Sequence, residues 1–247
     1  MNPPPADPLL DALHRVAPYA VASGLTPLIP VPFLDDYALR RVRERLVREL
    51  LAEHHAGLAV DDATVRALAG HAVREGSRVQ QFLGKAALLP LRFAWKVGHR
   101  RLLTALWVKD CVDMASLSLH HGYLLHHALA RGDLPPSALA TPDAARRVHA
   151  AILAACREVD TRPVNQALRR LLAGSRLVLD TLERTLDFWS EAWRGAWNGT
   201  PPTPPPPSDD DAAARASLAE RLAALLWEQD GYFHVLEARY ARHLAAA

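Results

Sequence analysis

Apolar positions recur with the period of an α-helix along almost the whole chain. They return every three or four residues, and prolines, glycines and capping residues separate the periodic stretches. No stretch alternates residue by residue as a half-buried strand would, and no Asn-Gly or Asp-Gly pair lies between two β-rich runs. The predicted helices cover 6–22 with an interruption near Pro18, 35–55, 61–89, 90–131, a stretch from 141, 160–197 and 211–245. We therefore predict an all-α fold, a multi-helix bundle.

A proline-rich stretch divides the predicted helices into a main body and a tethered end. Residues 199–212 contain a run of prolines and then three aspartates, which is typical of a semi-rigid, extended linker. It joins a helical bundle over 1–198 to a C-terminal amphipathic helix over 213–247. The apolar stripe of that helix can dock on its own bundle, dimerise or enter the groove of a protein partner. The stripe consists of Leu218, Leu222, Leu225, Leu226, Phe233, Leu236 and Tyr240.

Composition narrows the class of protein. Of the 247 residues, 50% are hydrophobic and 23% are charged, and the formal net charge is +2. The chain is too apolar for intrinsic disorder, and so small a charge favours no nucleic-acid partner. Cys111 and Cys156 are too few for a disulfide framework, so we expect reduced core residues. The start of the chain lacks the pattern of a secretory signal, so we expect a cytoplasmic protein that is able to associate with a membrane.

An uncharged run over residues 16–34 is the first candidate contact surface. It reaches the length of a membrane span, about 18 residues, but its four prolines do not suit a straight transmembrane helix. Two interpretations stay open: the run packs into the bundle as core, or it lies in a membrane interface. In the second case Pro30, Pro32 and Phe33 belong to the contact.

The amphipathic helix predicted over 35–55 could extend that contact. Arg41, Arg45 and Arg48 lie on the face opposite its leucines, where they could meet anionic lipid headgroups or a protein partner. Glu44 and Glu49 stand four residues before Arg48 and after Arg45, so a self-neutralised, solvated face is the alternative.

The same region carries a short motif. Residues 29–35 read Ile-Pro-Val-Pro-Phe-Leu-Asp and precede the amphipathic helix. They resemble the Ile-Pro-x-Pro-Phe-x-Asp sequence of a bacterial helical domain family, similar to the EcsC-like proteins and to the C-terminal domain of some membrane-associated GTPases. The resemblance implies association with the membrane surface and no catalytic residue. The chain departs from the family in its arginine-rich helix and in the histidines of its later apolar helix.

Polar residues form a stripe on the long helix, where Asp113, His120 and His127 share one face. His120 and His127 are about 10.5 Å apart along a helix, which is too far for a shared metal ion. The stripe is either a structural polar seam or the lining of a functional pocket.

The last predicted helix offers another set of polar residues. Asp230, His234 and Glu237 have the spacing of a three-ligand metal face, and equally that of a solvated polar face. We treat them as metal candidates only and expect no cofactor.

A tryptophan stripe is the last candidate. Trp189, Trp193 and Trp197 recur every four residues, which suits a membrane or protein interface as well as packing on the bundle.

Known enzyme motifs are missing from the sequence, including Gly-x-Ser-x-Gly, His-Glu-x-x-His and Gly-x-Gly-x-x-Gly. We therefore predict a non-enzymatic helical protein that associates with the membrane surface or acts as a protein-interaction module. The alternative is a soluble helical enzyme or ligand-binding bundle with a His/Asp pocket on helix 102–131.

Overall fold

A computed structural model describes residues 7–29, 34–57, 60–70, 100–140, 142–185 and 209–247. These residues are helical almost throughout and contain no strand, which confirms the predicted all-α fold. The helices are α1 (Pro8–Leu25), α2 (Leu34–His54), α3 (Asp62–Ala69), α6 (Arg100–Ala130), α7 (Pro142–Glu158), α8 (Arg162–Ala173), a helical stretch over 176–185, α10 (Asp209–Trp227) and α11 (Asp230–Ala245).

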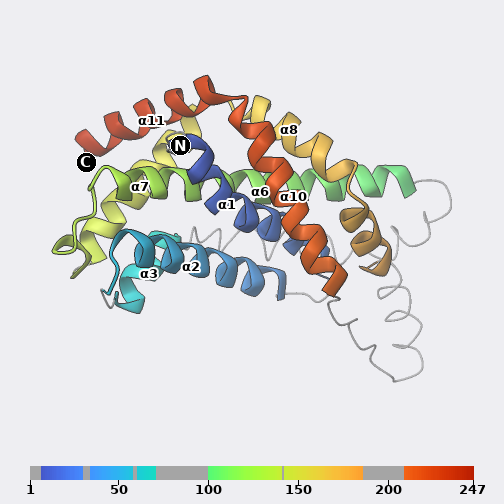
Figure 1. Cartoon of the computed structure of the whole chain (residues 1–247), viewed down its shortest axis with the longest axis horizontal. Helices are drawn as coiled ribbons and strands as arrows, with labels where there is room; N and C mark the ends of the chain where they lie inside the picture. The colour runs from blue at the N-terminus through green and yellow to red at the C-terminus, as the bar shows by residue number, and fades with distance from the viewer. Residues whose placement is uncertain (1–6, 30–33, 58–59, 71–99, 141, 186–208) are drawn as a thin grey trace, which may run out of the picture.

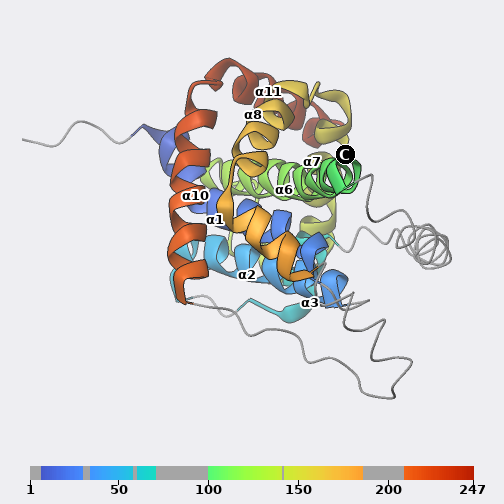
Figure 2. The ribbon, with the colours of Figure 1, turned by 90° about the vertical axis from the view of Figure 1, so that its right-hand side faces the viewer.

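Helix α6 is the central element of the bundle. It contacts α1, α2, α7, α8 and α11. Figure 2 looks almost along α6 and shows the other helices arranged around it. Its inner residues are buried on several sides, among them Leu119, Leu124 and Leu125. A helix that is apolar around most of its circumference is expected in the middle of a bundle, and this position brings α6 side chains to several neighbours at once.

Helix α1 accounts for most of the uncharged run. Asp7 caps it, because its side chain accepts hydrogen bonds from the amides of Leu9 and Leu10 at 2.9 and 3.4 Å. The helix continues through Pro18 to Leu25, although the sequence predicts an interruption near Pro18 and an end near residue 22. Burial of one face explains the difference, because tertiary packing outweighs the lost backbone hydrogen bond.

The described part of the uncharged run, residues 16–29, is largely core. Val16, Ala17 and Ala20 are fully buried, and Leu28 in the following 3-10 turn is 1% exposed. The core interpretation therefore holds for these residues, and the membrane-interface interpretation is wrong for them. Among the described helices, none combines the length and the apolarity that crossing a bilayer requires.

Two glycines allow close packing around α6. A Cβ added at Gly24 of α1 would lie 3.0 Å from the Cβ of Ala115 and 3.1 Å from the carbonyl oxygen of Cys111. A Cβ at Gly122 of α6 would lie 2.7 Å from Val16 Cγ1 and 2.8 Å from Leu46 Cδ2. Gly122 is thus the point where α1 and α2 both approach α6.

The C-terminal region differs from the predicted single helix over 213–247. The chain leaves the helix at residues 228–229, so α10 and α11 are separate helices, and α10 begins at Asp209, inside the predicted linker. In Figure 1, α10 crosses α1 and α11 lies near α7, and both pairs are in contact. Leu218, Leu222, Leu226, Phe233, Leu236 and Tyr240 join the core cluster of the bundle. The apolar stripe is therefore buried within its own chain, apart from Leu225, which is 37% exposed.

Candidate functional site

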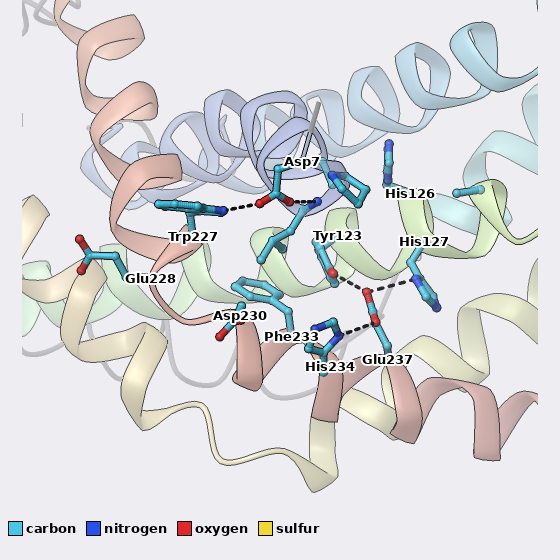
Figure 3. A pocket seen from close by; sticks show the side chains of 14 residues that line it. Asp7, Tyr123, His126, His127, Trp227, Glu228, Asp230, Phe233, His234 and Glu237 are labelled. Atoms are coloured by element: carbon cyan, nitrogen blue, oxygen red, sulfur yellow. Dashed lines mark hydrogen bonds and ion pairs between the residues drawn. The ribbon is translucent and has the colours of Figure 1, made fainter. Parts of the chain in front are cut away.

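A pocket of about 830 Å³ opens where the start of α1, the C-terminal half of α6 and the α10–α11 junction meet (Figure 3). α1 contributes Pro8, Leu9 and Ala12, with Asp7 at its cap. The remaining lining residues are Tyr123, His126, His127 and Ala130 of α6, with Trp227, Glu228, Asp230, Phe233, His234 and Glu237 from the C-terminal helices.

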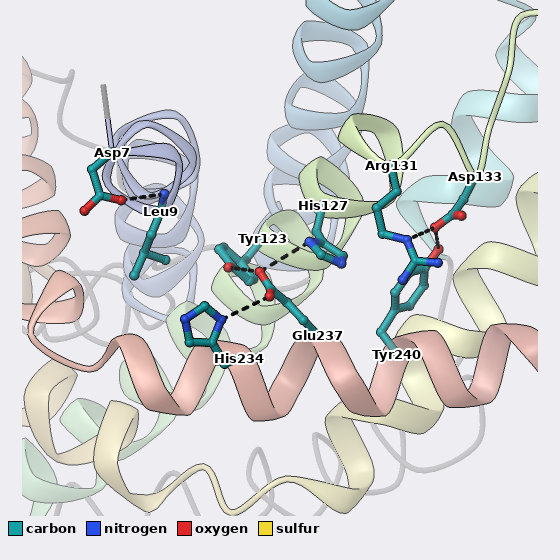
Figure 4. Close-up of polar contacts among 9 residues, drawn as sticks. All are labelled: Asp7, Leu9, Tyr123, His127, Arg131, Asp133, His234, Glu237 and Tyr240. Carbon is teal, nitrogen blue, oxygen red and sulfur yellow. Dashed lines mark hydrogen bonds and ion pairs between the residues drawn. The ribbon is translucent and has the colours of Figure 1, made fainter. Parts of the chain in front are cut away.

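Glu237 of α11 is the polar centre of this pocket. Its Oε1 accepts hydrogen bonds from the hydroxyl of Tyr123 at 2.5 Å and from Nδ1 of His127 at 3.3 Å. Its Oε2 lies 3.4 Å from Nδ1 of His234. Tyr123 and His127 share a face of α6 because they are four residues apart, and His234 lies one turn before Glu237 (Figure 4). Two helices therefore direct three donors at one carboxylate.

These donors stabilise the charged form of Glu237. They hold its pKa at about 2, the hydrogen bond from His127 contributing most, while partial burial acts in the opposite direction. Burial, reinforced by the adjacent carboxylate, raises the pKa of Tyr123 well above its usual range, so the phenol stays a donor. The Glu237 side chain is 23% exposed, so the pocket presents a carboxylate that remains ionised in moderate acid.

Aromatic side chains also line the pocket. The Trp227 indole donates from Nε1 to Oδ2 of Asp7 at 2.6 Å, which fixes the ring although the residue is 47% exposed. Phe233 is buried and stacks obliquely on Tyr123, with ring centroids 4.5 Å apart. The wall is thus held by contacts between residues far apart in the sequence.

The predicted polar pocket of Asp113, His120 and His127 is not formed, because the three side chains have different environments. Asp113 is exposed and pairs with Lys109 at 2.7 Å. His120 is buried, donates from Nδ1 to the carbonyl oxygen of Ser116 at 2.5 Å, and accepts from the hydroxyl of Tyr232. Of the three, only His127 lines the pocket. The three residues share a stripe of α6, but different helices cover its successive turns, so their side chains do not meet in one pocket.

Buried histidines make further contacts on α6. His121 donates from Nε2 to the carbonyl oxygen of Leu68 at 2.8 Å, and its ring lies edge-on to that of His149. Burial lowers the pKa of His120 to about 4 and that of His121 to about 3. Both are neutral structural residues near pH 7.

The metal candidates lie together without forming a metal site. Asp230, His234 and Glu237 all line the pocket, and Asp230 accepts a hydrogen bond from the amide of Gly231. Within the described ranges, no group of three or more His, Cys, Asp or Glu residues is placed to hold a metal ion.

The arginine face of α2 lies on the surface, as predicted. The side chains of Arg41 and Arg45 are 62% and 77% exposed. Arg45 pairs with Glu49 at 3.0 Å, and Arg48 pairs with Asp62 at 2.9 Å and with Glu44 at 3.8 Å. The face is therefore largely neutralised by carboxylates of α2 and by Asp62 of α3, which agrees with the alternative interpretation.

The other predicted contacts cannot be placed. Pro30, Pro32, Phe33, Trp189, Trp193 and Trp197 lie outside the described residues, as does the linker up to residue 208.

Several pocket residues have only a weak signal in the sequence. Tyr123 stands four residues before His127, and this spacing could have indicated a shared partner. Asp7 and Trp227 are 220 positions apart, and only the folded chain brings them together.

The chain was compared with protein-family models, with curated proteins and with solved structures, and no match was found. The resemblance at residues 29–35 therefore stays a prediction, and the functional argument rests on the geometry of the pocket.

Proposed function

We propose that this protein is a helical ligand-binding protein whose ligand occupies the pocket around Glu237. The observation that carries the proposal is an ionised, partly exposed carboxylate at the wall of a pocket of about 830 Å³. Pockets for small organic ligands measure roughly 300–1,000 Å³ and combine apolar walls with a few convergent polar groups. This pocket has both, and the three donors to Glu237 hold that carboxylate in place before any ligand arrives.

A thermal-shift screen tests the proposal. A library of mixed charge is screened against the wild type, Ala130→Phe and Ala130→Ser. Ala130 lines the pocket and is exposed, so a phenyl ring there obstructs the pocket without displacing core side chains. A ligand at 100 times its dissociation constant stabilises by about 2.7 kcal/mol.

We expect compounds that stabilise the wild type and the serine control and have no effect on Ala130→Phe. The proposal is wrong if no compound stabilises the wild type, or if the same compounds stabilise Ala130→Phe equally well.

Binding to an anionic membrane surface is a second candidate. It is supported by the exposure of Arg41 and Arg45, together with Tyr37, which is 53% exposed at the start of the same helix. Co-sedimentation with vesicles of anionic and of zwitterionic lipid at low salt tests it, with the double variant Arg41→Gln/Arg45→Gln. Binding to anionic vesicles that the double variant loses would support this candidate, and absence of binding would remove it.

A further inference from the structure

The charge of the pocket lining has one sign. Asp7, Glu228, Asp230 and Glu237 supply four carboxylates, and among the described residues that line the pocket none is lysine or arginine. The three lining histidines are His126, His127 and His234, which are uncharged when deprotonated. Carboxylates with no fixed cation beside them give the pocket a negative potential, which attracts a positively charged ligand.

Glu237 makes this charge available to a ligand. Its partners are the phenol of Tyr123 and the imidazoles of His127 and His234 (Figure 4). A phenol or a neutral imidazole donates a hydrogen bond without cancelling the charge of the carboxylate. Asp7 is similar, because its donors are the indole of Trp227 and two backbone amides. Among the described residues, no guanidinium or ammonium group pairs with either carboxylate.

Aromatic surface lies beside the carboxylates. Trp227 exposes nearly half of its surface while its Nε1 is fixed on Asp7 (Figure 3). Phe233 and Tyr123 are buried and pack against each other. The face of an aromatic ring attracts cations, most strongly for tryptophan, and the ring also packs against an apolar body. The attraction of the ring face is selective for a cation and gives an anionic group no gain.

We infer that the pocket binds a small organic cation, an ammonium group attached to an apolar body. The ammonium group lies toward Glu237 and the apolar body packs against Trp227. This inference rests on the proposed function and adds to it the chemical class of the ligand.

Isothermal titration with three probes that share a phenylethyl body tests whether the pocket prefers a cation. The probes are 2-phenylethyltrimethylammonium, 3-phenylpropionate and 3-phenylpropanol, each titrated at low salt near pH 7.5. The cation should bind about tenfold more tightly than the alcohol, and the anion more weakly than either.

Three variants test which residues bind the cation. Glu237→Gln should weaken binding of the cation about tenfold, because it removes a charge and keeps the shape. Glu49→Gln is the matched control, since this carboxylate lies on α2 away from the pocket, and it should bind like the wild type. Trp227→Leu should weaken binding of the cation about threefold and change binding of the alcohol less.

The two levels of the proposal fail differently. If the anion or the alcohol binds as tightly as the cation, or if Glu237→Gln binds the cation like the wild type, the cation inference is wrong and the ligand pocket stands. If none of the three probes binds at millimolar concentration, the cation inference is wrong, and the thermal-shift screen decides on the ligand pocket.

Discussion

Glu237 shows how one residue links two helices of the bundle. Its carboxylate accepts from Tyr123 and His127 of α6 and lies beside His234 of its own helix. These bonds stabilise the folded protein only while the carboxylate is ionised.

The low pKa of Glu237 gives its contribution to stability a defined pH window. The folded-state pKa of about 2 lies below the reference value of 4.5, so the contribution is present above about pH 4.5 and is lost as the pH falls toward 2. We expect Glu237→Gln to lower the free energy of unfolding at pH 7 by on the order of 2 kcal/mol. Urea denaturation at pH 7 and pH 3 checks this: the difference from the wild type should narrow at pH 3, and a constant difference would contradict it.

The buried histidines give a second pH dependence with a higher onset. His120 and His121 have folded-state pKa values of about 4 and about 3, below the reference value of 6.5. The unfolded chain therefore binds more protons below pH 6.5, and stability is lost as the pH falls through this range. We expect a loss on the order of 1 kcal/mol per histidine per pH unit between pH 6.5 and 4.5, measured by urea denaturation.

A substitution of His121 isolates this pH dependence of stability. His121→Leu cannot titrate and should reduce the slope of stability against pH, whatever its absolute stability. Equal slopes in the variant and the wild type would contradict the assignment.

Local spacing explains which site residues could be found from the sequence. His234 and Glu237 stand one turn apart, and the metal-face prediction grouped them for that reason. Asp113 and His120 share a stripe with His127 but not its environment, because the residues that cover each turn of α6 come from other helices. Such neighbours depend on tertiary packing, which helical periodicity does not encode.

At the scale of elements, the close approach of three helices at Gly122 is open to a direct test. Gly122→Ala would place a Cβ within 2.8 Å of both Val16 and Leu46, so we expect a loss of about 1–3 kcal/mol from displaced packing. Gly231→Ala is the control, because outside its own helix turn a Cβ there meets no atom of the described residues within 4 Å, and alanine favours the helix by up to about 1 kcal/mol. Thermal denaturation measures the stability change of each variant relative to the wild type. Equal stability changes would mean that α1 and α2 do not meet α6 at this glycine.

Docking of the C-terminal helices onto their own bundle is the second prediction at this scale. Leu222 of α10 is fully buried, whereas Leu225 on the same helix is 37% exposed. Leu222→Ala should cost about 2–5 kcal/mol and Leu225→Ala less than about 1 kcal/mol, as measured by chemical denaturation. If both variants are as stable as the wild type, α10 does not pack against the bundle.

Helix positions were easier to predict than helix breaks. Asp7-Pro8 and Asp61-Asp62 are strong start signals, and helices begin beside both. The break at 228–229 has no proline, and the nearest glycine, Gly231, lies inside α11. The segment over 160–197 also divides, with α8 ending at Ala173 and helical residues resuming at 176. Gly174 caps the end of α8, so this second break had a signal in the sequence, and the predicted single helices were too long.

At the scale of the whole molecule, amphipathic periodicity was sufficient for the fold class, since residues that recur every three or four positions must be buried by other helices. The pocket was not predictable, because it forms at the junction of the start of α1, the end of α6 and the turn between α10 and α11. Its charge and its aromatic wall become apparent only when Asp7, Trp227 and Glu237 are seen together.

The most direct test of the ligand-binding claim is an amide NMR titration of the full chain with 2-phenylethyltrimethylammonium. Chemical-shift changes should concentrate at residues 7–12, 123–130 and 227–237, and residues 62–69 of α3 and 162–173 of α8 should stay unchanged. Saturable changes at the pocket would support the account. Unchanged pocket resonances at millimolar probe, or changes confined to another surface, would contradict it.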